Sequence, residues 1–294
     1  MKKDKNGVTR RDLVRGTVGV ALGAALMNGK AFPAVEKPIR SSRVVLVRDP
    51  GVMDEKLNVD RVVLKKMLDQ SMTQFTGEKT SKEAWLKLIK PADTVGLVPT
   101  THLNATHEEV VDAVRTALLG IGIPQERILM VQRDIDKVKA CTALIALPAL
   151  KAHWLTGIGT VLKNYIMFSG EPSRYHEADS HKLGEIWNLP FVKGKTRLVL
   201  VDALYPLCDK GPQPDPRYRW AYKGLMAGTD PVAVETVCLR IITKKREALR
   251  GEPWPLQPPP LCVEAADKVY ALGTSRWEEI ELRHFGWEEN LLLA

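Results

Sequence analysis

The chain has 294 residues, of which 45% are apolar and 27% are charged, so its composition is that of a globular protein and not of a disordered one. The formal net charge is +8, but seven basic and two acidic residues lie within residues 1–31, which leaves +3 for the rest of the chain. That small excess excludes strong electrostatic binding to nucleic acid.

Residues 9–15 (Thr-Arg-Arg-Asp-Leu-Val-Arg) resemble the twin-arginine consensus of exported proteins. The apolar run that follows, 16–27, is too short to cross a bilayer as a helix, and small residues near position 31 fit a cleavage site. We therefore expect a signal peptide over 1–31, the twin-arginine export machinery as a partner, and no stable membrane span. The folded protein would then reside in the periplasm or another extracytoplasmic compartment. A disordered basic terminus and a retained anchor stay open as alternatives.

Beyond the leader, residues 32–294 alternate strand and helix patterns. Short β-branched runs predict strands at 43–47, 94–98, 128–131, 143–147 and 198–201. Apolar residues at helical spacing predict helices at 59–72, after capping boxes at 80–83 and 106–109, at 232–242 and at 264–272. This alternation predicts a single large α/β domain with a mostly parallel sheet and helices on both faces.

A lysine and a histidine follow the fourth predicted strand directly. Lys151 and His153 are two residues apart, so in extended chain they face the same side and can meet one ligand. Because ligands of such sheets bind beyond the carboxyl ends of the strands, we expect Lys151, His153 and Asp202, which follows the fifth predicted strand, to be catalytic.

A second pair, Lys163 and Asn164, follows a stretch with two glycines at 156–160. Backbone N–H groups of that stretch together with lysines suit a phosphate or a carboxylate. We therefore expect Lys163, Asn164 and Asp230 to bind a ligand, although a solvated loop, and for Asp230 a helix cap, are the alternatives.

The cofactor is left open by the sequence. His153 and His176 are candidate metal ligands if folding brings them together with a carboxylate, and lone surface histidines are the alternative. The four cysteines are far apart, so no iron–sulfur cluster is expected from this chain alone, and Cys141 and Cys238 lie in apolar runs typical of buried thiols.

Several of these segments together resemble the Domain of Unknown Function 362 family. The resemblance rests on 147–153, on 156–164, on His176, on Asp202 after its strand, and on the Gly-Thr-Asp-Pro-Val-Ala-Val of 228–234, and it covers roughly 43–245. Val98-Pro99-Thr100 stands where the family usually has Lys-Pro-Asn, and the cluster module that some members carry is missing. The resemblance implies one shared site built from Lys151, His153, Lys163, Asn164, His176, Asp202 and Asp230, and it names no reaction.

Two functions compete at this point. The first is an exported enzyme or binding protein whose ligand, at the carboxyl ends of the strands, is an anion, a metal or a redox cofactor. Such an enzyme would be associated with oxidoreductases. The second is a non-catalytic accessory protein of an exported redox complex, docking through Trp254, Trp277, Phe285 and Trp287 near the C-terminus. Those aromatic residues would instead anchor the tail to the domain if they pack internally.

Overall fold

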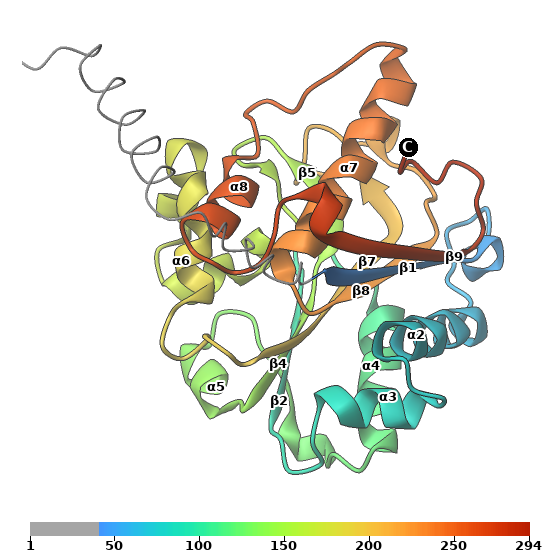
Figure 1. Ribbon diagram of the computed structural model, residues 1–294, viewed down its shortest axis with the longest axis vertical. Coiled ribbons are helices and arrows are strands. Elements are labelled where there is room, and N and C mark those ends of the chain that lie inside the picture. Colours follow the sequence, from blue (N-terminus) through green and yellow to red (C-terminus); the bar gives the residue numbers. More distant parts are fainter. Residues whose placement is uncertain (1–40) are drawn as a thin grey trace, which may run out of the picture. The chain divides into compact units, whose positions relative to one another are not determined.

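The computed structural model describes residues 41–294, which fold around one mixed β-sheet with helices on both of its faces (Figure 1). The twin-arginine signal expected over 1–31 lies outside the described residues. Among the described helices, none is long and apolar enough to cross a membrane.

Nine strands and seven α-helices make up the described part of the chain. The strands are β1 (Ser42–Arg48), β2 (Val95–Pro99), β3 (Ile128–Met130), β4 (Ala143–Leu147), β5 (Ala149–His153), β6 (Gly157–Ile158), β7 (Thr196–Leu207), β8 (Gly224–Gly228) and β9 (Ile280–Gly286). The helices are α2 (Arg61–Thr76), α3 (Ser81–Leu88), α4 (Glu108–Gly120), α5 (Ile135–Ala140), α6 (Leu183–Trp187), α7 (Pro231–Arg250) and α8 (Leu261–Lys268).

The sheet has the strand order β3-β2-β4-β7-β8-β1-β9, and β5 continues the line of β4 along the later half of β7. Five of the eight strand pairings are parallel, which confirms the mostly parallel sheet. Only β8 interrupts the parallel run of the main sheet, because it lies antiparallel between β7 and β1. The carboxyl ends of β1, β2, β4 and β7 therefore share one edge, while β8 ends at the opposite edge.

Alternation along the strands divides the core between the two faces. In β1, Val45 and Val47 pack against α2, α3 and α4, whereas Val44 and Leu46 pack on the face covered by α7 and α8 (Figure 1). Successive side chains of a strand point to opposite faces, so a buried strand between two helix layers is apolar at every position. The predicted architecture of helices on both faces is thus confirmed.

Two local expectations are wrong. The fifth strand does not stop before Asp202, because β7 continues to Leu207. The buried carboxylate of Asp202 accepts N–H groups of neighbouring backbone, which lets the strand contain it. The second capping box is also absent: α4 begins after His107, and Thr106 donates its hydroxyl to the carbonyl of Leu147 (2.5 Å) instead of capping the helix.

The C-terminal aromatic residues lie against arginines of the same domain. The guanidinium groups of Arg246, Arg240 and Arg48 lie 4.0, 4.2 and 4.5 Å from the ring centres of Trp254, Trp277 and Trp287, respectively. Phe285 packs against the core on the α2 face. These contacts favour the interpretation that the tryptophans anchor the tail.

The cysteines agree with the expectation of buried thiols. Cys141 and Cys238 are buried and free, as are Cys208 and Cys262. Burial raises the pKa of the Cys141 and Cys208 thiols to about 11. Their thiolates are therefore scarce at neutral pH, which fits a packing role.

Candidate functional site

A pocket of about 190 Å³ opens at the carboxyl edge of the sheet, beyond β2 and β4. Basic side chains dominate its polar lining, and no aspartate or glutamate lines it. The basic and amide groups are those of His102, Gln132, Arg133, Lys151, His153, Lys163 and Asn164. We call this the basic pocket.

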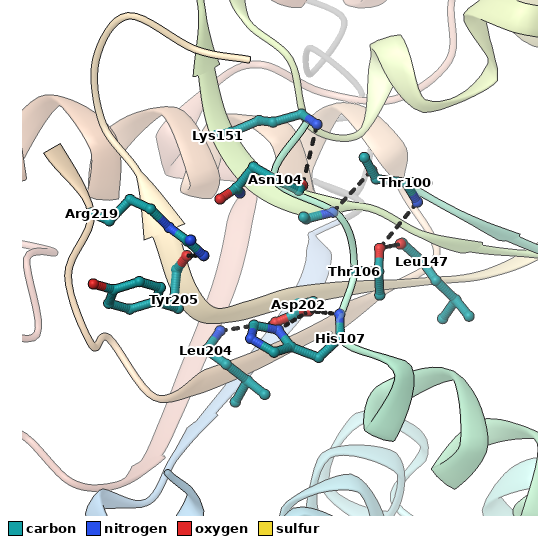
Figure 2. Close-up of polar contacts among 11 residues, drawn as sticks. Thr100, Asn104, Thr106, His107, Leu147, Lys151, Asp202, Leu204, Tyr205 and Arg219 are labelled. Carbon is teal, nitrogen blue, oxygen red and sulfur yellow. Dashed lines mark hydrogen bonds and ion pairs between the residues drawn. The ribbon is translucent and has the colours of Figure 1, made fainter. Parts of the chain in front are cut away.

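Two of these basic side chains, Lys151 and His153, belong to strand β5. Lys151 and His153 are separated by one residue of extended chain and are only 5% and 6% exposed. The side-chain nitrogen of Lys151 donates to the carbonyl of Leu103 (3.0 Å) and to that of Asn104 (3.4 Å, Figure 2), both in the loop that follows β2. Burial, and then the charge of Lys163, lower the pKa of Lys151 to about 7.

His153 is held in one tautomer. Its Nδ1 accepts the backbone N–H of Leu155 at 3.1 Å, so the neutral ring carries its proton on Nε2. Burial, and then the charge of Lys163, lower the pKa of His153 to about 2, which keeps the ring neutral. Gly159 lies against this ring, and a Cβ there would be 3.0 Å from the Cβ of His153. The ring is therefore a fixed hydrogen-bond donor.

The other pair comes from a short 3-10 helix, Leu162–Ser169. Its start is anchored by the buried carboxyl of Glu235 in α7, which accepts the N–H groups of Val161 (2.7 Å) and Leu162 (3.4 Å). Burial lowers the pKa of Lys163 to about 8. Asn164 donates to the carbonyl of Val98 at 2.7 Å, so it ties this helix to β2 at the pocket.

The two candidate metal ligands are neighbours in the fold. The rings of His153 and His176 stack with centres 5.6 Å apart. Within residues 41–294 no group of three or more histidine, cysteine, aspartate or glutamate side chains is placed to hold a metal ion. A metal ion bound to Nε2 of His153 would require the proton of the neutral ring to be on Nδ1. That proton would then face the N–H of Leu155, which now donates to Nδ1.

Asp202 has a different partner from those expected. Its Oδ2 accepts the backbone N–H of His107 and contacts Nδ1 of the same residue, both at 2.7 Å (Figure 2). Its Oδ1 accepts the N–H of Leu204 at 3.0 Å. Burial is the largest single influence on the pKa of His107 and lowers it. The hydrogen bond and the charge of Asp202 together raise the pKa by more than burial lowers it, so the pKa is above its ordinary value. The sequence marked His107 only as part of a capping box.

Asp230 lies at the opposite edge of the sheet, where β8 ends and α7 begins. Its Oδ1 caps α7 by accepting the N–H groups of Val232 and Ala233, both at 2.9 Å, and its Oδ2 accepts from Ser42 and Thr274. The residues that the resemblance assigned to one site therefore do not all lie together. Lys151, His153, Lys163 and Asn164 line the pocket, His176 stacks beside it, Asp202 pairs with His107, and Asp230 is remote.

Comparison with known proteins yields one match. No curated protein and no solved structure matches the chain. The sequence model of the family described as "Domain of unknown function (DUF362)" matches residues 107–240. Of the expected range, residues 43–106 and 241–245 fall outside the match. The match begins at His107 and includes every residue of the implied site. The resemblance to this family is confirmed over 107–240.

Proposed function

We propose that the basic pocket binds a small anion with a phosphate or carboxylate group. The observation that carries this proposal is the set of basic side chains, Lys151, His153 and Lys163, around a pocket with no acidic residue in its lining. A buried cation without a counterion is costly, and a bound anion removes that cost. Lys163 and the Nε2–H of His153 would then donate to the anion.

The loop after β2 and the 3-10 helix both contribute to this lining, through Thr100 and Asn164. The hydroxyl of Thr100 lies 3.4 Å from Oδ1 of Asn164 and accepts the N–H of Ala149 at 3.2 Å. These bonds fix the relative positions of the elements before any ligand arrives. Such preorganisation lowers the cost of binding.

Calorimetric titration with orthophosphate, sulfate and pyruvate tests the proposal. The pKa values of Lys151 and Lys163 are about 7 and 8. At pH 8, before an anion binds, both side chains are therefore partly neutral. A bound anion raises both pKa values, and binding must therefore take up protons. We expect the measured enthalpy to change with the ionisation enthalpy of the buffer.

The matched variants are Lys163→Met, inside the pocket, and Lys66→Met on the exposed side of α2. We expect Lys163→Met to weaken anion binding at least about tenfold, the size of a lost charged hydrogen bond, and Lys66→Met to leave it unchanged. Failure of all three anions to bind, or equal affinities in the two variants, would contradict the proposal.

We further propose that the protein is exported in its folded state. The support is the twin-arginine pattern at 9–15 and the apolar run after it. Fusion of residues 1–40 to a folded reporter tests this by fractionation. We expect the reporter in the extracytoplasmic fraction, and retention inside the cell when Arg10 and Arg11 are both changed to lysine. Export that persists in the double variant would contradict the twin-arginine route.

A further inference from the structure

The hydrogen-bond partners of Lys151 match a neutral amine better than an ammonium group. Its nitrogen has two acceptors among residues 41–294, the carbonyl of Leu103 and the carbonyl of Asn104, of which Figure 2 shows the second. An ammonium group has three N–H donors, whereas an amine has two and keeps a lone pair. Two carbonyls therefore account for both hydrogens of the amine, and its lone pair remains available.

The rest of the pocket also favours the neutral form. Lys151 is 5% exposed, and the pocket contains a second lysine but no carboxylate that would stabilise an ammonium group. Removal from water and a neighbouring cation both disfavour the charged form of a lysine. A lysine in this environment is a nucleophile at neutral pH.

Building on the anion site proposed above, we infer that Lys151 forms an imine with a small carbonyl compound that also carries an anionic group, of the 2-oxo acid class. The lone pair of Nζ attacks the carbonyl carbon and a C–N bond forms, while the oxygen becomes a hydroxyl group. The C–O bond of this carbinolamine then breaks. Both hydrogens of the amine leave with the oxygen as one water molecule, so no oxidant or reductant is needed.

Neighbouring groups have matching roles. Lys163 lines the same pocket and has no hydrogen-bond or ion-pair partner within residues 41–294, so its ammonium group is available for the carboxylate of the ligand. The Nε2–H of His153, fixed by the bond from Leu155 to Nδ1, is a donor for the carbonyl oxygen. A pocket of about 190 Å³ is smaller than the roughly 300–1,000 Å³ of sites for drug-sized ligands, which fits a compound of a few carbons.

Reductive trapping tests this inference. The purified protein is incubated with pyruvate and sodium borohydride, which reduces an imine to a stable secondary amine, and is then examined by intact mass and peptide mapping. We expect one adduct per chain, located on Lys151 and suppressed by excess orthophosphate. Mapping the wild-type chain locates the adduct without reliance on any variant that fails to fold.

Three comparisons complete the test. Lys151→Arg keeps a cation and should give no adduct, Lys163→Met should reduce trapping at least about tenfold, and Lys66→Met should match the wild type. Acetone, a carbonyl compound without an anionic group, should be trapped far less than pyruvate. Equal trapping of acetone, or an adduct on other lysines alone, overturns the inference.

Calorimetry separates the two proposals. If pyruvate or orthophosphate binds but borohydride traps nothing on Lys151, the imine is wrong and the anion site stands. If neither anion binds and nothing is trapped, both proposals fail.

Discussion

The surroundings of Arg246 and the basic pocket differ in how many partners they offer to basic side chains. Arg246 in α7 is 2% exposed, and its guanidinium donates to Asp209 (2.5 Å) and to the carbonyls of Cys208 (3.0 Å), Trp254 (2.8 Å) and Pro255 (3.1 Å). The basic pocket also contains a buried lysine, Lys151, but no acidic residue lines it. Lys163 has no hydrogen-bond partner at all among the described residues.

If the basic pocket binds an anion as proposed, this difference separates structural charges from functional ones. A buried charge with a complete set of partners stabilises one arrangement of the chain, as Arg246 does and as the carboxylates of Asp202 and Asp230 do. A buried cation without a counterion costs stability, and such a cost persists where function requires it. Removal of a partnered charge should therefore destabilise the fold, and removal of a pocket lysine should stabilise it.

The largest effect is expected for Asp202→Ala. The change leaves the buried N–H groups of His107 and Leu204 without an acceptor and His107 without its counterion. Loss of one partner of a buried charge pair costs about 3–5 kcal/mol, which lowers the melting temperature by roughly 10 °C for a domain of this size. Denaturant titration measures it. Asp136→Ala, at a side chain that is 91% exposed, is the control and should change stability by less than about 0.5 kcal/mol.

Lys151→Met should act in the opposite direction. We expect about 1–3 kcal/mol of added stability at pH 7, because the fold disfavours the charged form of this lysine and the change removes that cost, together with loss of anion binding. The pKa of Lys151 is about 7 in the fold, against 10.5 for a lysine in water, so the cost is complete below pH 7 and is relieved as pH rises toward 10.5. The stability advantage of the variant should shrink over that range. A destabilised variant with unchanged anion binding would remove the distinction between the two regions.

The sequence was informative where periodicity and strand ends determine position. The strand at 143–147 is predicted to the residue, and Lys151 and His153 share a pocket because β5 is extended, as the spacing of two requires. Lys163 and Asn164 join them although they come from a separate segment. Local pattern was enough for these residues because the carboxyl ends of parallel strands converge at one edge.

Contacts between distant segments could not be predicted in this way. His107 and Asp202 are 95 positions apart, and Glu235 contacts Val161 from 74 positions away, so no local pattern pairs them. The resemblance grouped Asp230 with the pocket residues, but it lies at the opposite edge of the sheet because β8 runs antiparallel to its neighbours β7 and β1. A single antiparallel strand reverses which loops face the pocket, and hydrophobic patterning carries no information on strand direction.

Glu235→Leu should have an intermediate effect on both stability and binding. The buried N–H groups of Val161 and Leu162 would lose their acceptor, which costs about 1–3 kcal/mol, and the start of the helix with Lys163 would lose its anchor. Orthophosphate affinity should fall along with stability. Burial raises the pKa of Glu235 to about 8, so the side chain is neutral at pH 7 and Glu235→Gln is the matched control. The glutamine keeps an acceptor for Val161 and should bind nearly as well as the wild type; equal losses in both variants would point to a packing effect.

The smallest effect, about 0.5–1 kcal/mol at pH 6, is expected for His107→Gln. Asp202 holds the pKa of His107 above its ordinary 6.5 even though burial acts in the opposite direction. A raised pKa contributes stability that is complete below pH 6.5 and is lost as pH rises through the value in the fold. The variant should therefore fall short of the wild type at pH 5.5 and approach it at pH 9. This pH dependence is opposite to that of Lys151, because one group is paired with a carboxylate and the other is not. If Lys151→Met and His107→Gln instead shifted stability in the same direction with pH, charge partnering would not be what distinguishes the two regions.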